Sequence, residues 1–506
     1  MKKLMCLLLC LSLLVAAMPL VAAEGGKDEL VVAYPVDPGN LSPFGTNSSQ
    51  VDFIVYQIYE ALFKVNDADG SIVPQIMDNY ILSEDGLTYT FNLKQGIKDT
   101  NGNEITASDV LFSFELCSKS PMAINTLCVD FDNTKVIDDY TFQLAVLSPS
   151  STYMSQFAKI YIVDEQSYAA SADGFISTPV GTGPYKLENW TQGTTVTLTY
   201  NEDYHGAEPQ VKKLVFKVIG EASQRTTALM TGEADINFDY LVTDANYIND
   251  SGTHITEDRP TNVVYAMYFN CDEGKPTSDI NLRKAIALAV DNEALTSVVY
   301  FGHNTPATTC ESKSCYDYDE SWEGNECYQY DLEKAKEYLA QSSYDGSPLT
   351  IITKSNVNSF DKLAEAVQNQ LKQLGVNVEI VQYDPATITT VTLEQPENWD
   401  INLSDHMTPS NYAVDSVNTI HVRRNYPHIS DEMKQEFSDV TSVALSTTDH
   451  DEMIEYASKA IALNQDYCTL YTICYSTLKL AYSNNLTNIN CYGCNIIDFS
   501  EIQYVA

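Results

Sequence analysis

The motif Cys491-Tyr-Gly-Cys494 has the spacing of a redox dithiol, in which a lowered thiol pKa makes one sulfur a nucleophile. A thioredoxin-like dithiol follows a strand and opens a helix, whereas this motif lies in a polar, Asn-rich stretch. Zinc would need more ligands, and none of the seven histidines forms a pair at i, i+3 or i, i+4. The spacing therefore indicates disulfide candidates rather than a redox or metal centre.

Motifs typical of enzymes are missing from the chain. It contains no Gly-x-Ser-x-Gly, no His-Glu-x-x-His and no Gly-x-x-x-x-Gly-Lys-[Ser/Thr]. Glycoside hydrolysis needs two placed carboxylates, and no pair can be singled out among 69 acidic residues. A secreted hydrolase and an adhesion or scaffold protein stay open as alternatives, but we do not expect an enzyme, and we expect no cofactor.

The N-terminal residues have the order of a secretion signal. Lys2 and Lys3 precede an apolar stretch at 4–17 that is too short to span a membrane, and small residues end at Ala23. We expect cleavage after Ala23 and a periplasmic or secreted, non-lipidated protein, because no cysteine stands at the cleavage point. An oxidising compartment permits disulfides.

Cysteine count agrees with export. Two of the 12 cysteines lie in the signal, so ten remain, an even number that suggests disulfides of unknown connectivity. Cys468 and Cys474 lie in one strand-like run and are too far apart to bridge each other, so Cys491 and Cys494 are candidate partners. The disulfide candidates are Cys117, Cys128, Cys271, Cys310, Cys315, Cys327, Cys468, Cys474, Cys491 and Cys494.

The chain is strongly acidic, with a formal net charge of −40 over 506 residues. Such a surface repels phosphate backbones and anionic lipid, so nucleic acid is not an expected partner. The excess acid is typical of a soluble secreted protein and does not define the ligand's charge. The length exceeds one hydrophobic core, which predicts two or more lobes.

Strands and helices alternate along the chain, which predicts an α/β fold. The hydrophobic pattern predicts strands at 30–34, 213–218 and 234–238, with helices at 50–63 and 221–231. A second strand–helix–strand unit starts at 349–353, and Gly375 ends its helix. Two such units about 130 residues apart predict two separate sheets. Ser108 or Asp109 is expected to cap a helix beginning at Val110.

Several segments, in order, carry a resemblance to a known family. They are Ser83–Val110, Pro179–Lys186, Asn201-x-x-Tyr204, Phe269-Asn270, Asn281–Asp291 and Tyr330–Leu339, with Asp331 as a helix cap. Together they resemble the family 5 extracellular solute-binding proteins of ABC transporters, which include oligopeptide, dipeptide and nickel binders. The resemblance covers nearly the whole mature chain.

The resemblance implies the bilobed periplasmic binding protein type II fold in its three-domain (cluster C) version. The chain is expected to cross between lobes near 173–183, 262–270 and 466–475, which would act as a hinge. The resemblance implies a signal peptide at 1–23 and a discontinuous domain I that consists of 24–60, 178–268 and 476–506. Domain II is then 61–177, and domain III, the second lobe, is 269–475.

The same resemblance implies ligand contacts in the first lobe. Residues after Leu41-Ser42-Pro43 line the ligand in peptide binders, which here are Asn47, Ser48 and Ser49. Their neutral polar groups suit hydrogen bonds to a peptide main chain. Relatives carry an aromatic residue near Ser120-Pro121, where this chain has Met122, which can fill part of a side-chain pocket.

In the second lobe this chain departs from the family pattern Trp-x-x-Asp-Tyr-x-x-Pro, whose aspartate binds the ligand's α-ammonium. Aligning on Pro409 and Tyr412 puts Asp405 at that position, whereas aligning on the strand that starts at Trp399 leaves no carboxylate there. We expect Trp399, Asp405 and His406 to contact ligand, with Asp405 as the ammonium anchor in the first register.

The resemblance therefore predicts a monomeric receptor that encloses a small peptide between two lobes and delivers it to ABC transporter permease subunits. A nickel chelate, haem or an oligosaccharide binds to relatives on the same fold, so the fold alone does not choose the ligand.

Overall fold

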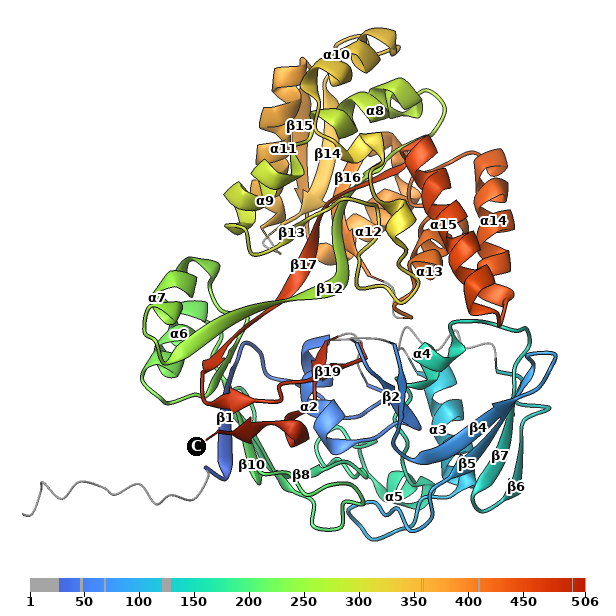
Figure 1. Ribbon diagram of the computed structural model, residues 1–506, viewed down its shortest axis with the longest axis vertical. Coiled ribbons are helices and arrows are strands. Elements are labelled where there is room, and N and C mark those ends of the chain that lie inside the picture. Colours follow the sequence, from blue (N-terminus) through green and yellow to red (C-terminus); the bar gives the residue numbers. More distant parts are fainter. Residues whose placement is uncertain are drawn as a thin grey trace, which may run out of the picture.

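A computed structural model describes residues 27–45, 49–67, 70–120, 129–355, 357, 359–407, 410–493 and 495–505. Two lobes are joined by the strands β12 (His254–Phe269) and β17 (Leu470–Ser483), which run side by side from the lower lobe into the upper one (Figure 1). We call the lobe that contains β1 the first lobe and the lobe that contains β14 the second.

One continuous sheet runs through both lobes, so the prediction of two separate sheets is wrong. At 16 residues, β12 spans roughly 50 Å and can pair in both lobes. In order, the sheet consists of β15 (Val378–Tyr383), β14 (Leu349–Lys354), β16 (Ile401–His406), β12, β17, β11 (Ile236–Phe238), β1 (Glu29–Tyr34), β10 (Lys213–Val218), β9 (Thr195–Tyr200) and β8 (Tyr185–Thr191), with β13 (Thr305–Pro306) on β17.

The pairing of β12 with β17 is interrupted where the chain passes between the lobes. Register shifts occur between Pro260 and Val264 and between Tyr265 and Ala266. A proline has no N–H to donate, and bulges bend a strand. The predicted crossings at 262–270 and 466–475 thus overlap β12 and β17. The predicted crossing at 173–183 is wrong, because Phe175 is buried in the core of the first lobe and Gly183 N donates to Ile58 O at 2.9 Å.

The first lobe combines its half of the long sheet with a separate four-stranded sheet. That sheet has the order β4 (Met77–Leu82), β5 (Thr88–Leu93), β7 (Thr141–Ala145) and β6 (Lys135–Asp138). Short strand pairs are β2 (Phe63–Val65) with β3 (Ile72–Pro74), β18 (Leu486–Thr487) with β21 (Gln503–Tyr504), and β19 (Cys491–Tyr492) with β20 (Ile496–Ile497). The helices are α2 (Ser49–Ile58), α3 (Ala107–Lys119), α4 (Tyr153–Phe157), α5 (Glu165–Ala170), α6 (Ala222–Met230) and α7 (Ala245–Asn249).

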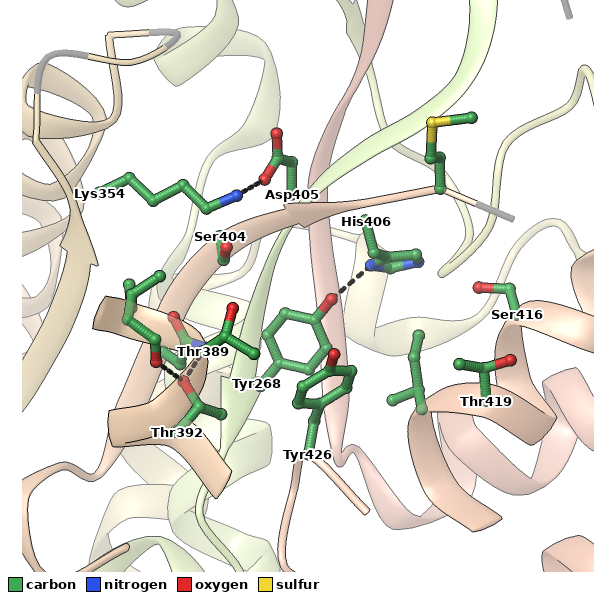
Figure 2. A pocket seen from close by; sticks show the side chains of 14 residues that line it. Tyr268, Lys354, Thr389, Thr392, Ser404, Asp405, His406, Ser416, Thr419 and Tyr426 are labelled. Atoms are coloured by element: carbon green, nitrogen blue, oxygen red, sulfur yellow. Dashed lines mark hydrogen bonds and ion pairs between the residues drawn. The ribbon is translucent and has the colours of Figure 1, made fainter. Parts of the chain in front are cut away.

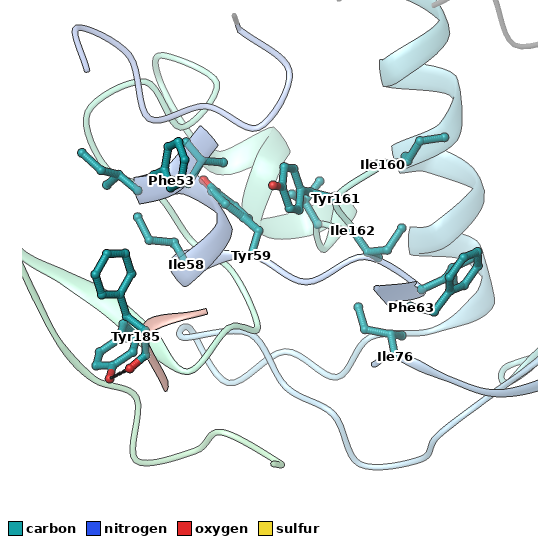
Figure 3. Packing of buried hydrophobic residues seen from close by; sticks show 14 of the residues in the cluster. Phe53, Ile58, Tyr59, Phe63, Ile76, Ile160, Tyr161, Ile162 and Tyr185 are labelled. Atoms are coloured by element: carbon teal, nitrogen blue, oxygen red, sulfur yellow. Dashed lines mark hydrogen bonds between the residues drawn. The ribbon is translucent and has the colours of Figure 1, made fainter. Parts of the chain in front are cut away.

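Most buried apolar side chains of the first lobe form one cluster that connects both of its sheets (Figure 3). The alternation along β5 buries Tyr89, Phe91 and Leu93 on one face, as its period of two predicts. The Phe91 ring stacks on Phe142 with centroids 5.1 Å apart. The two sheets of this lobe therefore share one core.

Helix ends in the first lobe differ from two predictions. Thr106, rather than Ser108 or Asp109, is the N-cap of α3, and Asp109 Oδ2 accepts from the Thr106 backbone N–H at 2.8 Å. The helix predicted at 50–63 ends at Ile58, because Phe63 already belongs to β2.

In the second lobe the sheet separates two apolar layers. Tyr265, Met267 and Phe269 of β12 face one layer, whereas Ala266 and Tyr268 face the other. The first layer contains α8 (Ile280–Ala289), α9 (Asn292–Tyr300), α10 (Leu332–Gln341) and α11 (Phe360–Leu374). The second contains α12 (Pro385–Glu394), α13 (Ala413–Val417), the π-helix η7 (Asn418–Arg423), α14 (Asp431–Ser446) and α15 (His450–Tyr467).

Two helix ends in this lobe lie where the sequence predicts them. Asp331 caps α10 by accepting from Lys334 N at 2.9 Å. Gly375 ends α11 with a φ of 96°, in the left-handed region that favours glycine. The strands on either side of α11, β14 and β15, pair in parallel.

Candidate functional site

A cavity of about 260 Å³ lies in the second lobe at the C-terminal ends of β14 and β16. β16 runs antiparallel to β12, and its last residue, His406, stands opposite Val264, beside the bulge at the lobe crossing. The cavity therefore lies at the edge of the second lobe that faces the first. In open α/β sheets, ligands bind outside the carboxyl ends of parallel strands.

An ion pair joins Lys354 and Asp405 at the rim of this cavity (Figure 2). The two residues lie near the C-terminal ends of neighbouring parallel strands, since Thr353 of β14 pairs with Leu403 of β16. Their side chains are 18% and 20% exposed, so water reaches both only in part. The pair places one positive and one negative group side by side where a ligand can reach them.

His406 belongs to a chain of hydrogen bonds that reaches into the protein. Its Nδ1 lies 2.6 Å from the Tyr268 hydroxyl and its Nε2 lies 3.1 Å from Glu311 Oε1. The same Glu311 oxygen accepts from Ser416 Oγ at 2.7 Å, and Glu311 is 1% exposed. A neutral imidazole satisfies both contacts by donating from Nε2 and accepting at Nδ1. Glu311 therefore fixes the orientation of His406 in the cavity wall.

Aromatic and aliphatic groups complete the walls. The Tyr268 and Tyr426 rings lie 5.8 Å apart, and Ile388 and Ile420 add aliphatic surface. Burial raises the pKa of Tyr268 well above its usual value, so its hydroxyl stays protonated. The lining therefore combines aromatic and aliphatic surface with polar side chains that can orient a small ligand.

A second hollow of about 570 Å³ lies between the lobes. Its lining includes Arg259 of β12, whose guanidinium bonds Glu257 at 2.9 Å and Cys491 Sγ at 2.8 Å. Across it the lobes touch, since the Tyr316 hydroxyl donates to Asp67 at 3.4 Å. Another interlobe contact joins Ser151 Oγ to the Ala444 carbonyl at 3.0 Å. The two lobes thus stand face to face around this space.

The predicted ligand contacts of the first lobe are only partly covered by the structure. Asn47, Ser48 and Met122 lie outside the described residues. Ser49 is the first residue of α2. The contact of these residues with a ligand therefore stays a prediction.

The predicted contacts of the second lobe fall on different sides of β16. Asp405 and His406 both line the cavity, one on each face of the strand. Trp399 is fully buried in a cluster with Ile352 and Ile388, so it supports the cavity wall from behind.

Sequence reasoning missed Lys354, Tyr268 and Glu311. Lys354 follows a predicted parallel strand, and the rule that ligands bind at carboxyl ends was the signal that could have found it. Tertiary packing alone brings Tyr268 to the cavity and Glu311 to the ring of His406, and no sequence motif marks them.

The cysteines do not form the predicted disulfide framework in the part of the chain that the structure covers. Cys128 and Cys494 lie outside it, and the thiols present are those of Cys117, Cys271, Cys310, Cys315, Cys327, Cys468, Cys474 and Cys491. Cys491 is not a neighbour of Cys468 or Cys474 as proposed, because it contacts Arg259 in the hollow between the lobes. Cys468 instead shares a hydrogen bond with Cys327.

Two features are absent from the described residues. They contain no group of three or more His, Cys, Asp or Glu side chains arranged to hold a metal ion. None of their helices is long and apolar enough to cross a membrane.

Known proteins with related sequences and folds are binding proteins. The Salmonella typhimurium glutathione-binding protein GsiB is 27% identical over 376 residues, 73% of this chain and 72% of its own length. The Helicobacter pylori periplasmic protein DppA, solved with the peptide STSA, has a TM-score of 0.75 at 22% identity, covering 94% and 98% of the two chains. NikA of Brucella suis, solved with Fe(III)-EDTA, has a TM-score of 0.84 at 20% identity, covering 95% and 100%.

The structural likeness establishes the bilobed periplasmic binding protein type II fold that the sequence predicted. A family match defines the chain more closely. The family described as bacterial extracellular solute-binding proteins, family 5 Middle, matches residues 71–424, well over half of the chain. The protein therefore belongs to the family 5 bacterial extracellular solute-binding proteins.

Proposed function

We propose that this protein is the extracytoplasmic receptor of an ABC importer and that it binds small peptides at the cavity beside β16. The observation that carries the proposal is the ion pair of Lys354 with Asp405 at the cavity rim. A free peptide carries an ammonium at one end and a carboxylate at the other. Asp405 takes the ammonium and Lys354 takes the carboxylate.

Charge balance explains why a zwitterion suits this site. When such a ligand binds, the ion pair between Lys354 and Asp405 opens and each side chain forms a new ion pair with the ligand. Neither partly buried side chain is then left without an opposite charge. A ligand with a single charge leaves either Lys354 or Asp405 unpaired, which is costly where water is excluded. A site of this kind discriminates against peptides with a blocked end.

The relatives support a peptide ligand. Glutathione is bound by one relative and the peptide STSA by a structural neighbour. By analogy with them, we propose export with cleavage after Ala23, a monomer, and transfer of the ligand to permease subunits. The proposed division keeps 24–60, 178–268 and 476–506 as domain I, 61–177 as domain II and 269–475 as domain III.

Blocked peptides test the proposal. Purified mature protein is titrated by calorimetry with tripeptides, their N-acetyl forms and their C-terminal amides. We expect the free peptides to bind at least about tenfold more tightly than either blocked form, because each block leaves one charge of the site unpaired.

Two results would contradict the proposal. If blocked and free peptides bind with equal affinity, Lys354 and Asp405 do not recognise the charged ends of the peptide. If a broad set of free peptides neither releases heat nor raises the melting temperature, the ligand is of another class. A ligand at a hundredfold excess over Kd should stabilise the protein by about 2.7 kcal/mol, so binding would not escape a thermal-shift measurement.

A further inference from the structure

Asn402 lies in the cavity wall with its amide held in one orientation. Successive residues of β16 alternate, so Asn402, Ser404 and His406 share the face opposite Asp405. Asn402 Nδ2 lies 2.9 Å from Thr392 Oγ1. The Thr392 hydroxyl itself donates to the Ile388 carbonyl at 2.8 Å, within α12. Because that proton is already used, Thr392 can only accept from Asn402, and the Asn402 oxygen must point away from Thr392.

The oxygen of Asn402 is left without a hydrogen bond. The residue is 5% exposed, and Oδ1 has no partner among the described residues. A buried acceptor without a donor costs about 1–3 kcal/mol. Asn402 lines a cavity of about 260 Å³, so a donor on a ligand that packs against this residue can satisfy the oxygen.

The charged side chains that line the same cavity already have a partner, because Lys354 pairs with Asp405. The carboxylate of Glu311 lies behind His406 and is outside the lining. Figure 2 shows Thr389 and Thr392 of α12 on one side of the hollow and Ser416 and Thr419 on the other. A charged ligand side chain that entered between these walls would meet no unpaired opposite charge in the lining.

We infer that this cavity selects a neutral ligand side chain that donates a hydrogen bond, such as an amide or a hydroxyl, to Asn402 Oδ1. The inference rests on the proposed function, because it names the side chain of the peptide that the site accepts. A site with an unpaired hydrogen-bond acceptor binds an analogue without a donor more weakly, because the acceptor of the site then stays buried and unpaired.

Matched peptides test this selection. Tripeptides of alanine carry Gln, Met or Glu at each position in turn, since Met has nearly the shape of Gln without a donor and Glu offers a charged acceptor. Calorimetry gives Kd for each peptide. At one position we expect Gln to bind about tenfold more tightly than Met, and Met more tightly than Glu.

Variants assign the preference to one atom. Asn402→Leu should reduce the ratio of Met to Gln dissociation constants to about one. The matched control Thr227→Val removes a hydroxyl on α6 of the first lobe, away from the cavity, that donates to the Ser223 carbonyl at 2.9 Å, so it should keep the ratio. If Asn402→Leu does not fold, Asn402→Asp should change the preferred side chain at that position from Gln to Lys.

The outcomes separate the inference from the proposed function. If peptides bind but Gln and Met bind equally at every position, or if Asn402→Leu keeps the preference, the inference is wrong and the receptor function stands. If no peptide binds at all, both are wrong.

Discussion

The two lobes arrange their buried apolar side chains differently. In the first lobe most buried apolar side chains belong to one cluster, and its aromatic rings stack on each other, as Phe91 does on Phe142. In the second lobe the sheet divides the core, and the layer beside the cavity also buries the charged and polar side chains of Glu311, Asp317 and His421.

This difference indicates which lobe recognises the ligand. The first lobe also buries charged side chains, such as Glu60, Asp99 and Arg225, but none of them lines the cavity beside β16. Buried polar groups destabilise unless they are bonded, so those that line or support this cavity indicate recognition. Stability and recognition should therefore respond to mutations in different lobes.

The largest effect is expected in the first lobe. Phe91→Ala removes a ring that is 0% exposed, which should lower the free energy of unfolding by about 3–5 kcal/mol. Denaturant unfolding of the ligand-free protein measures the loss. Peptide affinity, measured where the variant is folded, should stay within about twofold. A loss of binding free energy as large as the loss of unfolding free energy would contradict the assignment of stability and recognition to different lobes.

The next effect concerns binding rather than folding. Asp405→Ala should weaken free peptides by about 1.5–3 kcal/mol, because the ammonium loses a charge-assisted partner. Lys354→Met should weaken the same peptides, and the double variant should lose less than the sum, since the two groups act as a pair.

The control for this pair is Lys459→Met. Lys459 bonds Glu455 at 2.7 Å on the exposed side of α15, so its loss should leave affinity unchanged. If Asp405→Ala and Lys459→Met behave alike in calorimetry, Asp405 is not the anchor.

A pH effect is expected from His421 in the second lobe. Burial is the main cause that lowers its pKa to about 4, and its Nε2 lies 2.9 Å from Thr469 Oγ1. The unfolded chain takes up a proton near pH 6.5 and the folded protein only near 4. Stability from this residue is therefore present above pH 6.5 and is lost as pH falls towards 4, by roughly 2 kcal/mol at pH 5.

Urea unfolding at pH 7.5 and at pH 5 measures this effect. His421→Gln should lose less stability between the two values than the unchanged protein does. An equal loss in both proteins would assign the acid sensitivity to other groups.

The smallest effect tests a part of the second lobe away from the cavity. Gly375→Ala places a Cβ on a residue with a φ of 96°, which should cost about 1 kcal/mol of stability. Its ideal Cβ meets no atom within 4 Å, so the cost comes from the backbone alone. Peptide affinity should not change. A change would mean that the end of α11 is coupled to the cavity.

The sequence by itself determined the local elements and the family. The alternation at 213–218 gave β10 with the predicted bounds, and Gly375 ended α11 as predicted. These features depend on side-chain period and on backbone conformation, which neighbouring residues set. The family resemblance that the sequence segments indicated is likewise confirmed, because the family model matches residues 71–424.

Only the tertiary structure decided how the lobes are joined and which groups meet at the cavity. Pairing along β12 and β17 merges the sheets, and hydrogen bonding between strands distant in sequence leaves no local pattern. Lys354 meets Asp405, and Glu311 meets His406, because parallel strands end together and a distant loop packs against them. The orientation of the Asn402 amide on β16 depends on a proton of Thr392 on the helix α12, so no stretch of sequence could have specified it.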